Sequence, residues 1–177
     1  MVRDGAEGQG TIRVRFRGFR GHVAEARLLD SFSDSLDLAV MEADAPSGFE
    51  FWPNLLDSTD LERGDAVRAV GFGGEWRIPA SPGAFRQKNA GGQLVLERLD
   101  VHPGSSGGPV VSDDGIVGLI VVDTGIDTRA LPMDVIVNAF SQGNWNIAWH
   151  LGEWDASPTD ATLTPPTWDS ERWQQST

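Results

Sequence analysis

The chain has 177 residues, with 14 Lys and Arg against 26 Asp and Glu, which gives a formal net charge of −12 at pH 7. This length fits one globular domain with or without a tail. The acidity argues against nucleic acid as a partner, because that kind of binding depends on neutralising phosphate groups.

Cysteine is absent, so disulfides and thiol chemistry are excluded. This absence suits a reducing compartment, and we expect a cytoplasmic protein. No apolar run reaches the length of a transmembrane helix, so we expect no membrane partner.

Alternating apolar and polar residues predict strands in the first half of the chain. Residues 11–16 have an apolar side and a basic side, formed by Ile12, Val14 and Phe16 and by Arg13, Arg15 and Arg17. We interpret the basic side as a solvated strand face, because the chain as a whole is acidic. Further strands are expected over residues 22–29 and 66–72, with an apolar segment over residues 36–41 and loops over residues 45–64.

In the second half, strands are expected near Phe85 and over residues 94–99, 110–111 and 116–122. Asp113-Asp114-Gly115 lies between the last two of these, a pattern that indicates a hairpin. Pro132-Met133-Asp134 opens a helical pattern. Many short strands and one late helix predict an all-β barrel or sandwich.

The composition changes after Gly143, where five of the seven tryptophans lie, namely Trp145, Trp149, Trp154, Trp168 and Trp173. Residues 144–154 are expected to form a short helix that packs back on the barrel. Residues 155–177 are acidic and contain Pro and Thr, which is typical of a poorly ordered linker. We therefore predict a domain over residues 1–142 and a tail over residues 143–177, and we expect further domains in a longer parent chain.

The segment Gly104-Ser105-Ser106-Gly107-Gly108-Pro109 carries the strongest chemical signal in the sequence. Its glycines permit a tight turn between two apolar segments, where a serine hydroxyl points outward while backbone N–H groups converge. Acyl transfer needs such a nucleophile beside fixed donors for the developing oxyanion. The alternative is a glycine-rich hairpin turn that carries solvated serines.

This segment resembles the nucleophile turn of trypsin-like serine proteases. The resemblance implies that Ser106 is the nucleophile and that the N–H groups of Gly104 and Ser106 form the oxyanion hole. It implies no metal or cofactor. Ser105 stands where digestive trypsins have an aspartate that pairs with a freed N-terminus, so zymogen activation of that type is not expected.

Asp37, in Asp37-Leu38-Ala39-Val40-Met41, resembles the triad aspartate of these enzymes, especially of the bacterial high-temperature-requirement proteases. An aspartate inside an apolar strand needs partners for its carboxylate, and in the triad it orients the histidine. The alternative is an aspartate at a loop–strand junction that accepts bonds from backbone N–H groups. Asp34 is a neighbouring candidate, but it lies in a polar loop and does not fit the pattern.

Three further segments, residues 63–72, 114–119 and 129–136, are similar to segments of these proteases in order and spacing, so the resemblance covers roughly residues 1–142. It implies two packed antiparallel β-barrels with the active site in the cleft between them. The first barrel would be incomplete at its N-terminus, and a helix and tail would follow the second.

The three histidines of the chain, His22, His102 and His150, do not fit the family's catalytic histidine, which precedes the aspartate. His22 is too near Asp37, His102 lies on the nucleophile turn itself, and His150 falls in the tail. Residues 2–6 look like what directly follows that histidine in the family. We therefore expect this chain to lack its base and the natural chain to start upstream of Met1.

The resemblance places substrate recognition at two short segments, with Asp100, His102, Asp123, Thr124 and Gly125 as the candidate substrate-binding residues. Asp100 lies six residues before Ser106, by count the position of trypsin's pocket aspartate, and a buried carboxylate there would favour arginine or lysine in the substrate. The alternative is a solvated turn residue. Gly125 would leave room for a peptide to pair with the strand over residues 123–125.

The leading hypothesis is a serine endopeptidase that acts on protein or peptide substrates. The alternative is a non-catalytic trypsin-like module that binds peptides or scaffolds a larger assembly. An Ala-Ala-His sequence upstream would favour the enzyme. Without that histidine, we expect the 177-residue chain to be nearly inactive toward peptide bonds, because serine is a weak nucleophile without a base.

Overall fold

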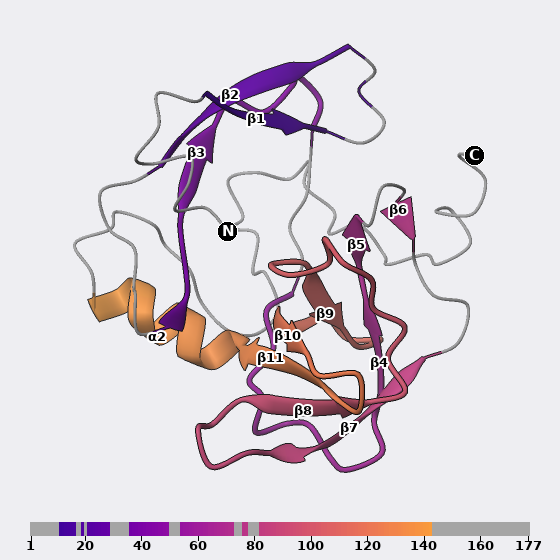
Figure 1. Cartoon of the computed structure of the whole chain (residues 1–177). Coiled ribbons are helices and arrows are strands. Elements are labelled where there is room, and N and C mark those ends of the chain that lie inside the picture. The colour runs from indigo at the N-terminus through magenta and orange to yellow at the C-terminus, as the bar shows by residue number, and fades with distance from the viewer. Residues whose placement is uncertain are drawn as a thin grey trace. The chain divides into compact units, whose positions relative to one another are not determined.

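The computed structural model describes residues 11–16, 19, 21–28, 36–49, 54–72, 76–77 and 82–142, and the structural statements below concern these residues. The chain divides into two compact units, Met1–Phe51 and Trp52–Thr177, which are described one at a time (Figure 1). The predicted tail over residues 143–177, including His150 and its tryptophans, lies outside the described residues.

The first unit contains an antiparallel sheet of three strands in the order β1 (Ile12–Arg15), β2 (Val23–Leu28) and β3 (Met41–Ala43). The alternation predicted for β1 is confirmed, since Ile12 and Val14 are half-buried while Arg13 and Arg15 are exposed. Arg17 lies outside the described residues. This short sheet is the counterpart of the expected incomplete first barrel.

Aromatic rings pack together at the end of this sheet. The Phe16 ring meets the Phe49 ring edge-on with 4.8 Å between centroids, and Phe19 meets Phe49 in the same way at 5.9 Å. The His22 ring packs against Phe16 at 5.6 Å. These contacts join the end of β1 to the residues before β2 and after β3.

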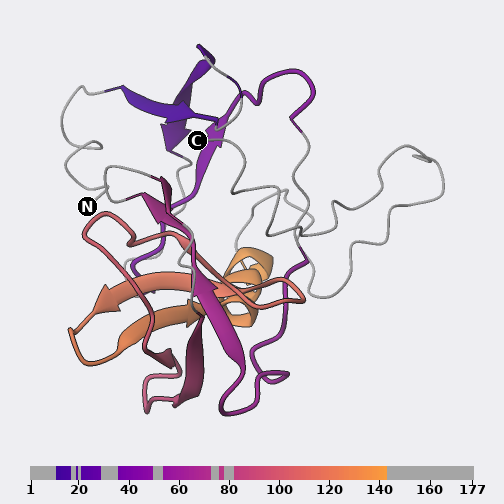
Figure 2. The same cartoon turned by 90° about the vertical axis from the view of Figure 1, so that its right-hand side faces the viewer.

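The second unit contains a closed barrel of six strands in the order β10-β11-β8-β7-β4-β9 (Figure 2). The strands are β4 (Ala66–Ala69), β7 (Gly83–Lys88), β8 (Leu94–Glu97), β9 (Pro109–Val111), β10 (Ile116–Asp123) and β11 (Thr128–Pro132). A small two-stranded sheet, β5 (Gly71–Phe72) with β6 (Trp76–Arg77), follows β4. The barrel and the three-stranded sheet confirm the predicted all-β class.

The barrel interior is filled by aliphatic side chains and one aromatic ring, contributed by Val67, Ala69, Phe85, Leu94, Leu96, Val110, Val117, Ile120 and Ala130. Strand β11 was not expected from the sequence. It pairs with both β10 and β8, so residues 128–132 complete the barrel before the helix begins.

Helix α2 (Met133–Gln142) begins where the sequence predicts it and contacts β10 and β11 (Figure 1). Asp134 in its first turn accepts hydrogen bonds from both the N–H and the hydroxyl of Ser58, which is 1% exposed. These bonds fasten the loop before β4 to the start of the helix. In the described part of the chain, no helix is long and apolar enough to cross a membrane.

Candidate active site

Residues 102–108, called the nucleophile turn because the sequence predicts the nucleophile there, connect the region after β8 to β9 in the second unit. Ser106 is exposed on it, and its hydroxyl makes no hydrogen bond to any described residue. Two of its glycines have positive φ, 98° at Gly104 and 81° at Gly107. Such angles favour glycine, which explains why the motif needs glycine at both positions.

The first half of this segment is a type II turn over residues 102–105. The N–H of Ser105 donates to the carbonyl of His102 at 3.0 Å, and Gly104 is the third residue, with φ of 98°. Positive φ at the third position occurs in type II and type I′ turns, and type I′ also needs it at the second. Pro103 cannot supply it, because its ring fixes φ near −65°.

The second half is another type II turn, over residues 105–108. The N–H of Gly108 donates to the carbonyl of Ser105 at 2.9 Å, and Gly107 is the third residue. Ser106 is the second residue and has negative φ, since Asp37 and Arg98 are the described non-glycine residues with positive φ. Ser106 therefore stands at the corner of a tight turn.

Three of the backbone N–H groups of this segment are already occupied. Those of Ser105 and Gly108 close the two turns, and that of Gly107 donates to the carbonyl of Ile120 at 2.8 Å. The N–H groups of Gly104 and Ser106 have no acceptor among the described residues. These two groups are the pair that the sequence predicts as oxyanion donors.

The barrel anchors the turn on two sides. The N–H of Ile120 in β10 donates to the carbonyl of Gly108 at 2.9 Å, and the N–H of Val70 donates to the carbonyl of Pro109 at 2.9 Å. Gly108 also approaches the segment after β4 closely, since a Cβ there would lie 2.8 Å from the carbonyl oxygen of Ser105 and still closer to that of Val70. The position of Ser106 therefore follows from the barrel strands.

Sequence reasoning missed Gly71, which packs directly under the turn. A Cβ at Gly71 would lie 2.5 Å from Oγ and 2.8 Å from Cβ of Ser105, whose side chain is 6% exposed. Only glycine permits this approach. The Gly71-Phe72 dipeptide was assigned to a strand, but nothing local in the sequence indicates its contact with Ser105.

Asp37 lies on an exposed turn of the first unit and not inside an apolar strand, one of the two interpretations that the sequence left open. Its φ is 52°, a left-handed conformation that aspartate tolerates better than most residues and that interrupts a strand. Its carboxylate makes no hydrogen bond or ion pair to another described residue. The strand of this region begins later, at Met41.

The two histidines that the structure describes have partners of their own. Nε2 of His22 lies 3.4 Å from the carbonyl oxygen of Asp44, and its ring packs on Phe16. His22 precedes β2 and does not lie within it. Nε2 of His102 lies 3.3 Å from a carboxylate oxygen of Asp100.

Asp100 is not buried, as a carboxylate at the floor of a pocket would be. Its side chain is 63% exposed and pairs with His102, which is 47% exposed. An exposed pair of this kind is screened by water and contributes little to stability. The geometry therefore agrees with the alternative of a solvated residue beside the turn.

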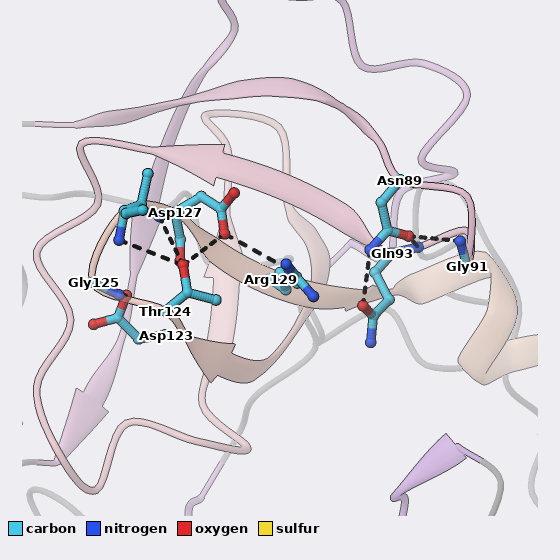
Figure 3. Close-up of polar contacts among 9 residues, drawn as sticks. Asn89, Gly91, Gln93, Asp123, Thr124, Gly125, Asp127 and Arg129 are labelled. Carbon is cyan, nitrogen blue, oxygen red and sulfur yellow. Dashed lines mark hydrogen bonds and ion pairs between the residues drawn. The ribbon is translucent and has the colours of Figure 1, made fainter.

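The segment 123–125 was expected to be a strand, but β10 ends at Asp123 and a tight turn follows (Figure 3). The carboxylate of Asp123 accepts the N–H of Gly125 at 3.1 Å. The hydroxyl of Thr124 donates to Asp127, at 2.9 Å to the carboxylate and 3.0 Å to the carbonyl. Thr124 and Gly125 thus form part of the turn. Of the three residues, Asp123 is the one that lies in a strand.

Next to the nucleophile turn, one edge of β10 has no paired strand among the described residues. Strand β9 pairs with β10 from Ile116 to Leu119, and the turn continues that edge through Ile120. Beyond Ile120, β10 pairs with β11 through Val122 and Asp123. No other described strand pairs with this part of β10. The described residues hold no cluster of His, Asp or Glu that could bind a metal ion.

Comparison with known families gives one match. A family profile described as a trypsin-like peptidase domain matches residues 2–119, and among curated proteins no sequence matches the chain. The matched residues include the nucleophile turn and Asp37.

Proposed function

Because the chain belongs to the trypsin-like peptidase family, we propose that it is a serine endopeptidase domain in which Ser106 attacks the carbonyl carbon of a peptide bond. The N–H groups of Gly104 and Ser106 would bind the oxyanion, and Asp37 would orient the histidine that acts as base. The observation that supports this proposal is a pair of N–H groups with no acceptor among the described residues, beside an exposed serine hydroxyl.

Oxyanion stabilisation requires donors that are fixed before the reaction begins. The first type II turn holds the Gly104 N–H, and the anchoring of Gly107 and Gly108 on Ile120 limits the movement of Ser106. Before substrate binds, these donors have no acceptor among the described residues that they would have to release. Their full hydrogen-bonding capacity is thus available for the charge that develops on the carbonyl oxygen.

The substrate class is an extended peptide. The open edge of β10 from Val121 to Asp123 continues directly from Ile120, which anchors the nucleophile turn. A peptide in extended conformation would add to this edge through main-chain hydrogen bonds and carry its carbonyl toward Ser106. Asp100 and His102, paired and exposed beside the turn, would contact side chains of the substrate.

The general base is not assigned to any of the three histidines. His22 packs on Phe16 and His102 pairs with Asp100, and these contacts favour a second candidate function, a peptide-binding module without turnover. Both functions use the same turn and the same strand edge. They differ in whether Ser106 becomes acylated.

Acylation by p-nitrophenyl acetate tests the proposal, because its leaving group departs without a general acid. We expect the acetyl group on Ser106, detected by mass spectrometry of a peptide digest, and its loss in Ser106→Ala. Ser112→Ala is the matched control, since Ser112 also lies in a turn between strands and has no assigned role. Acylation elsewhere but not at Ser106 would rule out the enzyme and leave the binding module.

A further inference from the structure

Ser105 belongs to both turns of the nucleophile segment. Its N–H closes the first turn on His102, and its carbonyl closes the second by accepting the N–H of Gly108. Its side chain is 6% exposed, and its Oγ accepts the N–H of His102 at 3.4 Å. The proposed reaction makes no use of this buried hydroxyl, so its placement needs another explanation.

The first turn has an alternative conformation that would remove an oxyanion donor. In a type I turn, ψ of the second residue differs by about 150° from its type II value, which turns the central peptide unit over. The carbonyl of Pro103 would then point where the N–H of Gly104 points now. Proline at the second position is compatible with both types, so Pro103 does not decide between them.

Two contacts of the Ser105 side chain hold the turn in the conformation of the structure, which is type II. The bond from the N–H of His102 to Oγ joins the first and last residues of the turn a second time, although 3.4 Å is long for such a bond. Packing on Gly71 adds to it, because Ser105 lies so close that a Cβ at residue 71 would be 2.5 Å from its Oγ. The uncharged side chain of Ser105 thus holds the turn through one hydrogen bond and one packing contact.

We propose that Ser105, seated on Gly71, is a positioning residue that keeps the N–H of Gly104 directed at the oxyanion. This inference rests on the proposed function, since it assigns a role to Ser105 in the same site. It predicts that the turn is already in its donor-presenting form without a bound peptide and without an ion pair to hold it.

Nuclear magnetic resonance tests the turn without requiring activity. In a type II turn the Hα of Pro103 lies close to the amide proton of Gly104, and in a type I turn it points away, so the nuclear Overhauser effect between them reports the conformation. We expect a strong effect in the wild type. In Ser105→Ala the ratio of type II to type I should fall by up to about tenfold, the value of one ordinary hydrogen bond.

Gly71→Ala tests the packing contact and leaves the Ser105 hydroxyl in place. The added Cβ would lie 2.5 Å from Oγ of Ser105, so the Ser105 side chain must move. The Overhauser effect between Pro103 and Gly104 should then be weaker than in Ser105→Ala. Gly91→Ala is its matched control, because a Cβ there meets only Asn89 Oδ1 at 3.3 Å. Ser112→Ala is the control for Ser105→Ala, since Oγ of Ser112 accepts the N–H of Asp114 at 3.3 Å.

Acylation of Ser106 by p-nitrophenyl acetate gives the second readout. The rate should fall by up to about tenfold in Ser105→Ala, in line with the loss of one ordinary hydrogen bond. In Gly71→Ala it should fall about a hundredfold, the lower end of what loss of one oxyanion donor causes. Both controls should keep the wild-type rate and amide spectrum.

The inference is overturned if Ser105→Ala and Gly71→Ala both fold, judged by their amide spectra, and both keep the wild-type Overhauser effect. A wild type with a strong effect but no acylation of Ser106 would refute the proposed function and leave the positioning of the turn intact. If Ser105→Ala does not fold, Gly71→Ala decides alone. If Gly71→Ala does not fold, Ser105→Ala decides.

Discussion

One peptide unit, between Pro103 and Gly104, determines whether the nucleophile turn offers a donor or an acceptor to a bound carbonyl group. The donor form requires φ of 98° at Gly104. For an L-residue with a Cβ, such an angle costs about 1–2 kcal/mol, which is comparable to the energy that holds a turn in one of two types. The chemistry of the site therefore depends on the absence of a single methyl group.

Gly104→Ala should convert the turn to type I and remove one oxyanion donor. We expect the acylation rate of Ser106 by p-nitrophenyl acetate to fall about 10²-fold. Gly92→Ala is the matched control, because Gly92 also has positive φ, 78°, in a hairpin away from the site. Both variants should lose similar stability in urea, and an equal loss of acylation in both would contradict the specific role of Gly104.

Asp57 provides a residue-level test of electrostatics. Its carboxylate accepts the N–H of Thr59 at 2.8 Å and the Thr59 hydroxyl at 2.7 Å, and these bonds, the backbone one first, lower its pKa below the ordinary value of 3.8. The charged form is favoured by folding, so the resulting stability is present above the unfolded-state pKa and is lost as pH falls through the folded-state pKa.

Thr59→Ala should raise the pKa of Asp57 toward 3.8 without restoring it fully, because the backbone N–H of residue 59 remains. The carboxyl carbon resonance of Asp57 followed by pH titration measures this. Thr11→Ala, at an exposed position in the other unit, should leave the titration unchanged. An Asp57 midpoint that is the same in the wild type and in Thr59→Ala would show that the hydroxyl bond does not form in solution.

At the scale of elements, the local sequence pattern was sufficient to predict two strands that a short turn connects directly. The Asp113-Asp114-Gly115 turn and its two strands were predicted and are confirmed, because an Asp-Gly turn between apolar runs determines a hairpin locally. Strand β11 could not be predicted in this way. Its pairing with β8 and β10 depends on residues distant in the chain, and its own sequence, Thr128–Pro132, includes an arginine and ends in proline.

The contact between Ser58 and helix α2 is an element-level feature with a measurable energy. Asp134 accepts both donors of a serine that is 1% exposed, so Asp134→Ala would leave an N–H and a hydroxyl buried without an acceptor. We expect a loss of about 2–3 kcal/mol in the free energy of unfolding, measured in urea. Asp134→Asn keeps the Oδ1 acceptor and should lose less than half of that.

Asp113→Ala is the control for this measurement. Asp113 is 88% exposed and lies 3.7 Å from Arg68, and such surface pairs contribute at most about 1 kcal/mol. A loss in Asp134→Ala no larger than that in Asp113→Ala would mean that the helix does not depend on the Ser58 contact.

At the scale of the whole molecule, the sequence predicted the all-β class and a tight glycine-rich turn, but not what supports that turn. The roles of Gly104 and Ser106 were taken from the resemblance of a short motif and remain predictions, whereas the motif's glycines agree with the positive φ at Gly104 and Gly107. The support from Gly71 and the burial of Ser105 were missed, because both arise when β4 and β9 pair across the barrel. Asp37 was identified by resemblance alone, and its role as an orienting carboxylate remains a prediction.

The general base of the proposed reaction is not assigned to any of the three histidines. The 177-residue chain should cleave casein at a rate near background, because neither described histidine is free of other partners and serine is a weak nucleophile alone.

Free imidazole should raise acylation of Ser106 by p-nitrophenyl acetate in proportion to its concentration, and Ser106→Ala should abolish that increase. If Asp37 orients the base, Asp37→Asn should reduce the imidazole effect, while Asp44→Asn, an exposed aspartate of the same unit, should not. Casein cleavage that is rapid without imidazole and lost in Ser106→Ala would show that the chain already contains its base, and the same assay on His22→Ala and His102→Ala would then identify it.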